Sequence, residues 1–279
     1  MADDVLIVGG GFAGLAAGVA LAEAGRRVRL FEQKPYLGGR ARSFVDSATG
    51  SVVDNGQHLM MGCYHETRRF LETIGTADRV AFQPRLHVPF IEPGRGVTSL
   101  ECPDWPAPWH LVLGVLASDS FAAGEKLEIA RLGRWLSSAN GLGAPASPRL
   151  SRPEESSERP SGLTVARWLR QLGQSEDACR KFWDLICIAA MNEDPRVASA
   201  SIFERVLRLA LFQSAEDSCL GIPRMGLSEC YAEAARDFIT SRGGRVEVGR
   251  SVTSILLRPA SAGEARSICE GVELANGER

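Results

Sequence analysis

Three glycines near the N-terminus have the spacing of a loop that binds phosphate groups. Gly9, Gly11 and Gly14 satisfy the pattern G-x-G-x-x-G. In such a loop the first glycine allows a tight turn, the second lets the backbone approach a pyrophosphate, and the third permits close helix–sheet contact. The helix that follows points its positive end at the phosphates, so we expect its first residues, Phe12 and Ala13, to bind the nucleotide as well.

An acidic residue, Glu32, stands at the end of the next apolar segment. A carboxylate placed there can accept hydrogen bonds from the 2′- and 3′-hydroxyls of a ribose, and it disfavours a 2′-phosphate. The acid therefore argues against NADP. We include its neighbour Gln33 among the expected cofactor-binding residues. The pattern up to this point fits both NAD and FAD.

A second glycine loop, "LGGRARSF", follows shortly after the acid. Gly38 and Gly39 expose the backbone, and Arg40 can place its guanidinium on a pyrophosphate or near a flavin. The run from Glu32 to Arg40 resembles the E-x-x-x-x-x-G-G-R segment of the flavin amine oxidase and phytoene desaturase superfamily. This resemblance implies FAD as the cofactor, with Gly39, Arg40 and Ala41 among the residues that bind it.

Two further segments resemble parts of the same superfamily. "VEVGRSVTSI" is similar to the segment whose backbone meets the FAD adenine, which assigns that contact to Val252. "GSVVDNGQHLMMGCY" corresponds to a D-x-G segment that passes close to the isoalloxazine, with Asp54 and Gly56 at the matching positions. The Asp-Asn-Gly context is typical of a turn, so we expect Asp54 to cap a loop and Gly56 to contact the cofactor.

The residues after Gly56 narrow the resemblance to one family. Gln57-His58, the apolar "LMMG" that follows, and "FWDLICIAAMNEDPRVASA" from Phe182 to Ala200 are similar to the hydroxysqualene dehydroxylases of bacterial hopanoid and squalene synthesis. The resemblance implies a reductive removal of the allylic hydroxyl from hydroxysqualene, a polyprenyl alcohol, to give squalene. It also implies the squalene-pathway synthases that act upstream as partners.

Such a reaction needs an acid for the departing hydroxyl and an apolar site that excludes bulk water. His58 is the expected catalytic residue, because a histidine beside the flavin can be protonated near neutral pH. The alternative is a structural histidine hydrogen-bonded to the backbone. The other three histidines, at positions 65, 87 and 110, lack the spacing of metal ligands, so we expect no metal site.

The pattern of apolar residues predicts the strands and the helix that position these residues. "VLIVG" is a continuous apolar strand, Phe12 to Ala24 is a helix rich in Ala and Gly, and Arg27 to Glu32 is a second strand. These form one strand–helix–strand unit. The expected fold class is α/β: a Rossmann-type FAD-binding domain with an inserted, largely helical substrate domain, as in amine oxidases and phytoene desaturases.

The expected domain boundaries lie where the composition and the pattern of expected helices and strands change along the chain. Residues 1–84 and 222–279 form the discontinuous FAD-binding domain, and residues 85–221 form the substrate domain, with a flexible loop rich in Pro and Ser at 141–162. The pattern predicts helices at 111–117, 124–140, 163–173, 176–190, 192–212 and 227–241, followed by strands at "RVEVG", "SVTSILL" and "ICEGVEL".

Composition limits the kinds of partner. The net charge is −2, from 32 basic and 34 acidic side chains, so we expect no nucleic-acid binding. The seven cysteines are scattered without a C-x-x-C pair, and no secretory signal is recognisable, which indicates a cytoplasmic protein. The apolar stretch at 109–117 is too short to span a bilayer. Together with Trp105 and the stretch at 203–212 it could line a polyprenyl tunnel, contact a membrane surface or form plain core.

The chain departs from the superfamily at its C-terminal side. Members of the superfamily continue well past a position like Arg279, so we expect a truncated member that lacks the C-terminal part of the fold. Three other readings stay open: a carotenoid-type desaturase, a flavin amine oxidase, and a non-catalytic fragment that binds flavin or prenyl groups. With three tyrosines in the chain, an aromatic cage for an amine is the less favoured of these.

Overall fold

The computed structural model describes residues 4–56, 58–92, 94, 96–138, 162–258 and 268–279. The chain forms two compact units, which we describe separately. The first unit comprises residues 1–59, 65–81 and 222–279, and the second comprises residues 60–64 and 82–221. The division expected from the sequence has the same boundary at 221/222, but it assigns residues 60–64 and 82–84 to the first unit. Which unit binds the cofactor and which binds substrate stays a prediction.

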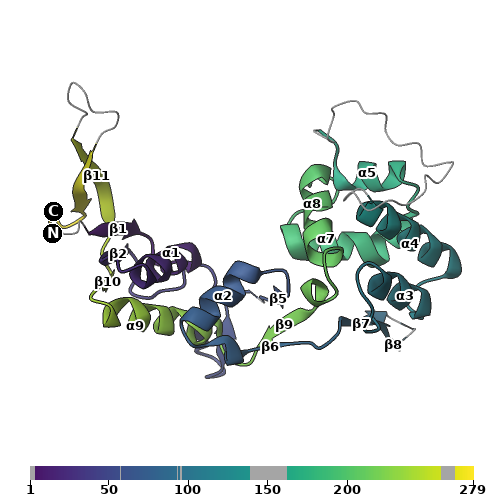
Figure 1. Ribbon diagram of the computed structural model, residues 1–279, viewed down its shortest axis with the longest axis horizontal. Coiled ribbons are helices and arrows are strands. Elements are labelled where there is room, and N and C mark those ends of the chain that lie inside the picture. Colours follow the sequence, from purple (N-terminus) through teal and green to yellow (C-terminus); the bar gives the residue numbers. More distant parts are fainter. Residues whose placement is uncertain (1–3, 57, 93, 95, 139–161, 259–267) are drawn as a thin grey trace. The chain divides into compact units, whose positions relative to one another are not determined.

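A three-stranded parallel sheet lies at the centre of the first unit (Figure 1). Its order is β1 (Val5–Val8), β2 (Val28–Glu32) and β10 (Arg245–Val248). Strand β2 lies between the other two and is buried, with Val28 and Leu30 wholly inaccessible to solvent. The continuous apolar run that predicts a strand buried on both faces is that of β1 instead, and this prediction is wrong in part, because β1 is only partly buried and Val8 is 56% exposed.

Two helices of the first unit pack against each other. Helix α1 (Phe12–Glu23) connects β1 to β2, and α9 (Glu233–Ser241) precedes β10. The two helices meet at Gly18, where an added Cβ would lie 2.8 Å from the Cδ1 of Ile239. Small residues on α1 therefore allow a close helix–helix approach. The helix predicted at 227–241 begins as a π-helix, η4 (Ser228–Ala232), and continues as α9.

The rest of the first unit consists of short elements. The strands β11 (Val252–Arg258) and β12 (Ile268–Leu274) form an antiparallel hairpin, whose Val272 and Leu274 pack with Phe31 of β2. The hairpin of β3 (Ser43–Val45) and β4 (Val52–Asp54), the helix α2 (His65–Thr73) and the 3-10 turn η1 (Ala77–Arg79) were not predicted.

The second unit is mainly helical. Its core contains large, fully buried side chains, among them Trp183, Phe203 and Leu207. Its main elements are β7 (His87–Glu92), β8 (Gly96–Glu101), α3 (Trp109–Ala117), α4 (Ala123–Ser138), α5 (Val165–Gln171), α6 (Glu176–Ala178), the π-helix η2 (Cys179–Trp183), α7 (Asp184–Met191), α8 (Ala200–Leu211) and the 3-10 turn η3 (Glu216–Ser218). Three short strands, β5 (Met60–Met61), β9 (Leu220–Pro223) and β6 (Val80–Phe82), form a sheet in that order, and the residues of β6 and β9 are divided between the two units.

One predicted helix begins later than expected. The pattern placed a helix from Asn192 to Phe212, but α8 starts at Ala200. Asn192 adopts the left-handed conformation, with φ of +50°, and this ends α7. The intervening turn is held by Asp194, whose carboxylate accepts a hydrogen bond from the backbone N–H of Arg196 at 2.8 Å. The loop predicted at 141–162 lies outside the described residues except for Gly162.

The apolar stretches considered for a tunnel are mostly core. Leu111 and Val115 of α3 and Phe203 and Leu207 of α8 belong to one buried cluster. Apolar side chains at helical spacing are buried there by neighbouring helices, as the plain-core alternative predicts. The tryptophans before and at the start of α3 differ, since Trp105 and Trp109 are 55% and 48% exposed.

Candidate cofactor site

The first glycine loop turns sharply between β1 and α1. The N–H of Gly9 donates to the carbonyl of Phe31 at 2.8 Å, which joins the loop to strand β2. An added Cβ at Gly14 would lie 1.9 Å from the carbonyl oxygen of Gly9, so only glycine fits there. The third glycine of the pattern therefore permits α1 to start directly against the turn, as the sequence predicts.

The start of α1 is open to an anion. Its N-cap is Gly11, which has no side chain to cap the helix, and the first turn carries no acidic residue. Within the described part of the chain, no acceptor is recorded for the N–H groups of Phe12, Ala13 or Gly14. Free N–H groups at the positive end of a helix are suited to a phosphate.

Glu32 is held in place by two backbone N–H groups. Its Oε2 accepts from Gly10 and its Oε1 accepts from Lys34, each at 2.7 Å. The residue is 7% exposed. Because a carboxylate offers about four acceptor positions, each oxygen keeps capacity for a ribose hydroxyl. The neighbouring Gln33 has an exposed side chain.

The second glycine loop lies beside the first. The N–H of Gly38 donates to the carbonyl of Gly10 at 2.8 Å, and residues 11 and 38 form an isolated parallel bridge. Gly39 has φ of +61°, and an added Cβ would lie 3.2 Å from the Cα of Gly11. A side chain at position 39 would therefore be strained and would push the two loops apart.

Arg40 and Ala41 complete the turn of the second loop. The N–H of Ala41 donates to the carbonyl of Gly38 at 3.1 Å, which closes the turn. The side chain of Arg40 is exposed, and its carbonyl accepts from the Nδ2 of Asn55 at 2.9 Å. No ion pair is recorded for Arg40 in the described ranges, so its guanidinium is available to a pyrophosphate.

Asp54 links the D-x-G segment by a hydrogen bond to Leu227, which is distant in the sequence but lies in the same unit. Its Oδ1 accepts hydrogen bonds from the hydroxyl of Ser43 at 2.6 Å and from the N–H of Leu227 at 3.0 Å. These bonds agree with the prediction that Asp54 caps a loop. Gly56, two residues on, has φ of +85° and donates its N–H to the carbonyl of Asp54 at 2.8 Å.

His58 makes a local contact. Its Nδ1 lies 2.8 Å from the carbonyl oxygen of Gly56. A carbonyl only accepts, so Nδ1 carries the proton in this arrangement and Nε2 is the acceptor of the neutral ring. The contact matches the structural alternative for this histidine, and its catalytic role stays a prediction. Gln57 lies outside the described residues.

The segment expected to meet the adenine runs past Glu32. The N–H of Arg250 donates to the carbonyl of Glu32, and that of Gly249 donates to the carbonyl of Lys34, both at 2.8 Å. Val252 follows at the start of β11, where its side chain packs against the small cluster around Phe31. The structure thus places the backbone before Val252 beside the expected ribose position.

Three contributors were missed from the sequence. Gly10 donates to the carboxylate of Glu32, and an added Cβ there would lie 2.6 Å from the Cδ2 of Leu37. Lys34 contributes through its backbone. Tyr231 is fully buried and donates its hydroxyl to carbonyls of the second loop. The run of three glycines could have indicated Gly10, but no local pattern marks Tyr231.

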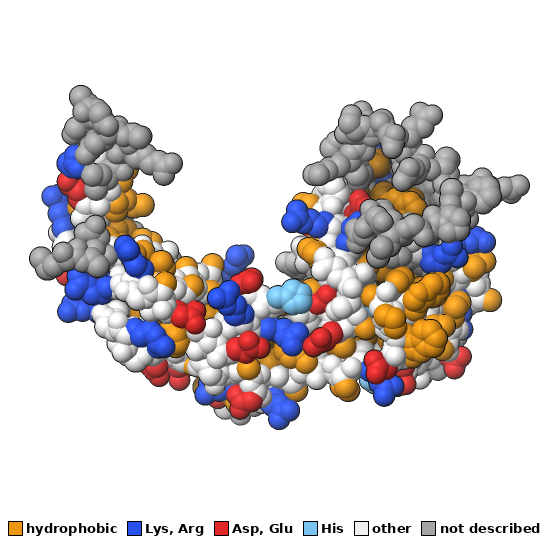
Figure 2. Space-filling view, in the orientation of Figure 1, with side chains coloured by type: hydrophobic (Ala, Val, Ile, Leu, Met, Phe, Trp, Pro, Cys, Tyr) orange, Lys and Arg blue, Asp and Glu red, His pale blue; other side chains and the backbone are white. Residues whose placement is uncertain are grey.

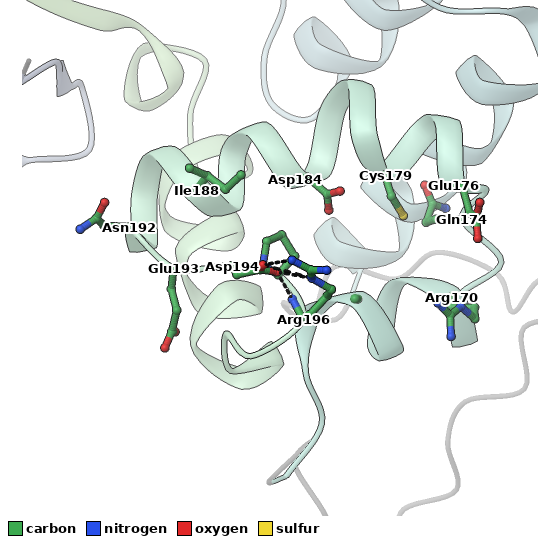
Figure 3. Close-up of a pocket in the computed structure, with 12 residues that line it drawn as sticks. Arg170, Gln174, Glu176, Cys179, Asp184, Ile188, Asn192, Glu193, Asp194 and Arg196 are labelled. Atoms are coloured by element: carbon green, nitrogen blue, oxygen red, sulfur yellow. Dashed lines mark hydrogen bonds and ion pairs between the residues drawn. The ribbon is translucent and has the colours of Figure 1, made fainter.

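A separate groove lies within the helical unit (Figure 3). Its volume is about 630 Å³, and its walls come from α5, the segment from α6 to α7, and the turn at 192–196. Asp194 and Arg196 lie two residues apart in that turn and pair with each other, with the Nε of Arg196 at 3.0 Å from an oxygen of Asp194. Burial and the nearby Asp194 raise the pKa of Asp184. No residue of the two glycine loops lines this groove, which distinguishes it from the nucleotide site.

Two kinds of site are not found in the described ranges. No group of three His, Cys, Asp or Glu side chains is arranged to hold a metal ion. None of the described helices is long and apolar enough to cross a membrane.

Comparison with known proteins identifies the family. Residues 12–278 match the family described as flavin containing amine oxidoreductase. The chain belongs to this family. Membership confirms the predicted superfamily, the α/β fold and the oxidoreductase class, and at the level of the family it confirms a flavin cofactor. The match includes α1, Glu32 and the second glycine loop.

Named relatives agree with the narrower resemblance. The chain is 30% identical over 265 residues to a hydroxysqualene dehydroxylase from Rhodopseudomonas palustris, a match covering 91% of this chain and 55% of the relative. It is 24% identical over 269 residues to a zeta-carotene desaturase from Zea mays, covering 93% and 44%. The chain thus spans about half the length of these relatives.

A solved structure supports the fold alone. An oxidoreductase from Methanosarcina mazei aligns with a TM-score of 0.61 at 17% identity, covering 98% of this chain and 56% of that one.

Proposed function

We propose that this chain binds FAD in the two glycine loops and acts as a hydroxysqualene dehydroxylase. The observation that carries the proposal is the side-by-side placement of the loops, with Gly39 against Gly11 and the Glu32 carboxylate fixed beside them. A dinucleotide pyrophosphate needs such a glycine-lined approach, and its ribose needs the acid.

Each part of the site has a separate task in binding FAD. The N–H groups of Phe12 and Ala13 would hold pyrophosphate oxygens at the helix end. Glu32 would accept hydrogen bonds from the ribose hydroxyls, and Arg40 would neutralise phosphate charge. Gly56 and the backbone near Val252 would contact the flavin and the adenine. Bound FAD, once reduced by an external electron donor, would supply as hydride the two electrons that a reductive dehydroxylation needs.

The substrate class comes from the relatives. The hydroxysqualene dehydroxylase of R. palustris and the zeta-carotene desaturase of Z. mays carry the names of long polyprenyl substrates. We infer that the substrate here is a polyprenyl alcohol, hydroxysqualene, in a hopanoid or squalene pathway whose synthases act upstream. The carotenoid-type desaturase is the second candidate, because its named relatives also match over most of the chain.

His58 is the proposed acid for the departing hydroxyl. Its Nδ1–H is engaged by the carbonyl of Gly56. The Nε2 would carry the second proton of the imidazolium and release it to the leaving oxygen. The hydrogen bond at Nδ1 fixes the ring orientation, which is what a positioned general acid requires.

We also propose that the protein is cytoplasmic and contacts a membrane surface. The exposed indole rings of Trp105 and Trp109 support it, since tryptophan favours the boundary between lipid and water. Sedimentation with lipid vesicles tests this point. Replacing both residues with Ser should reduce the bound fraction several-fold.

The function is tested by anaerobic incubation with dithionite-reduced FAD and hydroxysqualene, with squalene quantified by mass spectrometry. Formation of squalene by the whole chain supports the dehydroxylase. FAD binding without squalene formation, combined with turnover of a carotenoid precursor, supports the desaturase instead. FAD binding without turnover of either substrate supports a non-catalytic flavin-binding fragment.

A further inference from the structure

Tyr231 contacts both glycine loops from the opposite end of the sequence. It lies in the π-helix η4 and is fully buried. Its hydroxyl lies 2.6 Å from the carbonyl oxygen of Ala41 and 3.0 Å from that of Gly38. Its ring packs on Phe12, with ring centroids 4.7 Å apart. One side chain therefore touches the first loop through its ring and the second through its hydroxyl.

The hydroxyl of Tyr231 matters more to the carbonyl of Ala41 than to the carbonyl of Gly38. A phenol has a single proton, so it can donate fully to one carbonyl at a time. The carbonyl of Gly38 also accepts from the N–H of Ala41, which keeps it paired without the tyrosine. For the carbonyl of Ala41, Tyr231 is the partner recorded in the described part of the chain. Burial raises the pKa of the Tyr231 phenol, so the hydroxyl stays protonated and donating throughout the neutral range.

The helix that carries Tyr231 is itself fixed to the segment after the second loop. Ser43 and Ser228 exchange hydrogen bonds, with N–H to Oγ distances of 2.9 and 3.1 Å. Asp54 accepts from the N–H of Leu227 at 3.0 Å. A π-helical turn is rare and is frequently found at functional sites. These bonds hold η4 in register, so that the hydroxyl of Tyr231 meets the turn of residues 38–41.

We propose that Tyr231 is a positioning residue for nucleotide binding, which fixes the Gly38–Ala41 turn so that its backbone and Arg40 face the pyrophosphate. The proposal rests on the proposed function for its ligand, FAD. Tyr231 does not touch the ribose acid, since Glu32 is held by Gly10 and Lys34. Its effect should therefore fall on the pyrophosphate part of the ligand and spare the nucleoside part.

The test uses two hydroxyl-removing variants of the whole chain. Tyr231→Phe removes the hydroxyl and keeps the ring against Phe12. Tyr36→Phe is the matched control, because no hydrogen bond is recorded for that hydroxyl in the described residues and its ring contact with Arg42 is retained. Affinities are measured by calorimetric titration with FAD and by competition with adenosine. We expect Tyr231→Phe to weaken FAD about five- to tenfold, the range for one buried hydrogen bond, and to leave adenosine unchanged.

Hydrogen exchange of the free protein gives a readout that does not depend on the ligand. We expect faster exchange in the peptide spanning residues 38–42 of Tyr231→Phe, with β2 and the control variant unchanged. Unchanged exchange, or an equal loss of adenosine and FAD affinity, would overturn the positioning role. A wild-type chain that binds neither ligand would overturn the cofactor proposal and the role of Tyr231 together. Normal wild-type binding with no effect of Tyr231→Phe would overturn the role of Tyr231 alone.

Discussion

The two glycine loops of the cofactor site are held in different ways. The first loop is fixed by its own neighbourhood: strand β2 bonds Gly9, and the carboxylate of Glu32 receives the N–H of Gly10. The second loop contacts the first through Gly38, but its turn depends on Tyr231, 190 residues from Ala41. Local sequence is thus sufficient to build one loop, whereas the other requires the completed fold.

This difference predicts how each loop responds to amino-acid substitutions. The first loop carries the severe steric constraint, since a Cβ at Gly14 would lie 1.9 Å from the carbonyl oxygen of Gly9. The second loop has a milder steric limit, where a Cβ at Gly39 would lie 3.2 Å from the Cα of Gly11, and it also depends on the hydroxyl of Tyr231, which can be removed without a clash. Substitutions in the first loop should therefore damage folding and binding together, and substitutions around the second should weaken binding more selectively.

The largest effect is expected for Gly14→Ala. The new Cβ would meet the carbonyl oxygen of Gly9 at 1.9 Å, so α1 must move away from the turn. We expect a loss of about 3 kcal/mol in the free energy of unfolding, measured by urea denaturation, and no detectable FAD binding. Gly25→Ala is the control for a glycine with open space around it, although its φ of +73° adds a smaller strain. Equal stability of Gly14→Ala and wild type would remove the steric account of the first loop.

The next effect is expected for Glu32→Gln. The amide offers one acceptor oxygen, so either Gly10 or Lys34 loses its partner and faces an N–H₂ group. We expect a loss of about 2 kcal/mol in stability and at least tenfold weaker binding of adenosine as well as FAD. Weaker FAD with unchanged adenosine would show that the acid does not hold the ribose.

A smaller effect is expected for Asp54→Ala. The substitution removes the acceptor of the Ser43 hydroxyl and of the Leu227 N–H, both in part-buried hydrogen bonds. We expect a loss of about 1 kcal/mol and a few-fold weaker FAD binding. Asp78→Ala, at an exposed position in the turn η1, is the control. An effect as large as that of Gly14→Ala would contradict the division between the two loops.

Hydrogen exchange measured as a function of pH should increase in the helical unit before it increases in the glycine loops. His110 is 1% exposed, and burial lowers its pKa in the folded protein. The unfolded chain therefore binds this proton more readily, so stability is full above the usual histidine pKa near 6.5 and falls as the pH drops below it. We expect hydrogen exchange to increase first around α3 between pH 7 and 5, with the hydrogen-bonded amides of Gly9 and Gly10 still protected. Loss of protection in the loops first would contradict this order. His110→Gln should flatten the dependence.

Much of the first loop could be predicted because its determinants are local. A buried strand, three spaced glycines, a small-residue helix and an acid at the end of the next strand each have a recognisable pattern. Asp54 was predicted as a loop cap from its Asp-Asn-Gly context, and its hydrogen bonds agree. The start of α8 was wrong, because the left-handed Asn192 breaks a run that otherwise has helical composition.

Tyr231 could not be predicted from the sequence. It occupies an apolar position of an amphipathic stretch, where a tyrosine is expected to be core. Only the pairing of residues 38–41 with η4 gives its hydroxyl a partner, and that pairing depends on bonds among Ser43, Ser228 and Asp54. Contacts between segments so far apart follow from tertiary structure and leave no periodic signal.

The most direct test of the account is a crystal structure of the chain with FAD. The account predicts pyrophosphate oxygens within hydrogen-bond distance of the N–H groups at the start of α1 and of the Gly39–Arg40 backbone, with the adenosine ribose on Glu32. An FAD bound with its pyrophosphate away from both loops, or with Glu32 facing no ribose hydroxyl, would contradict it.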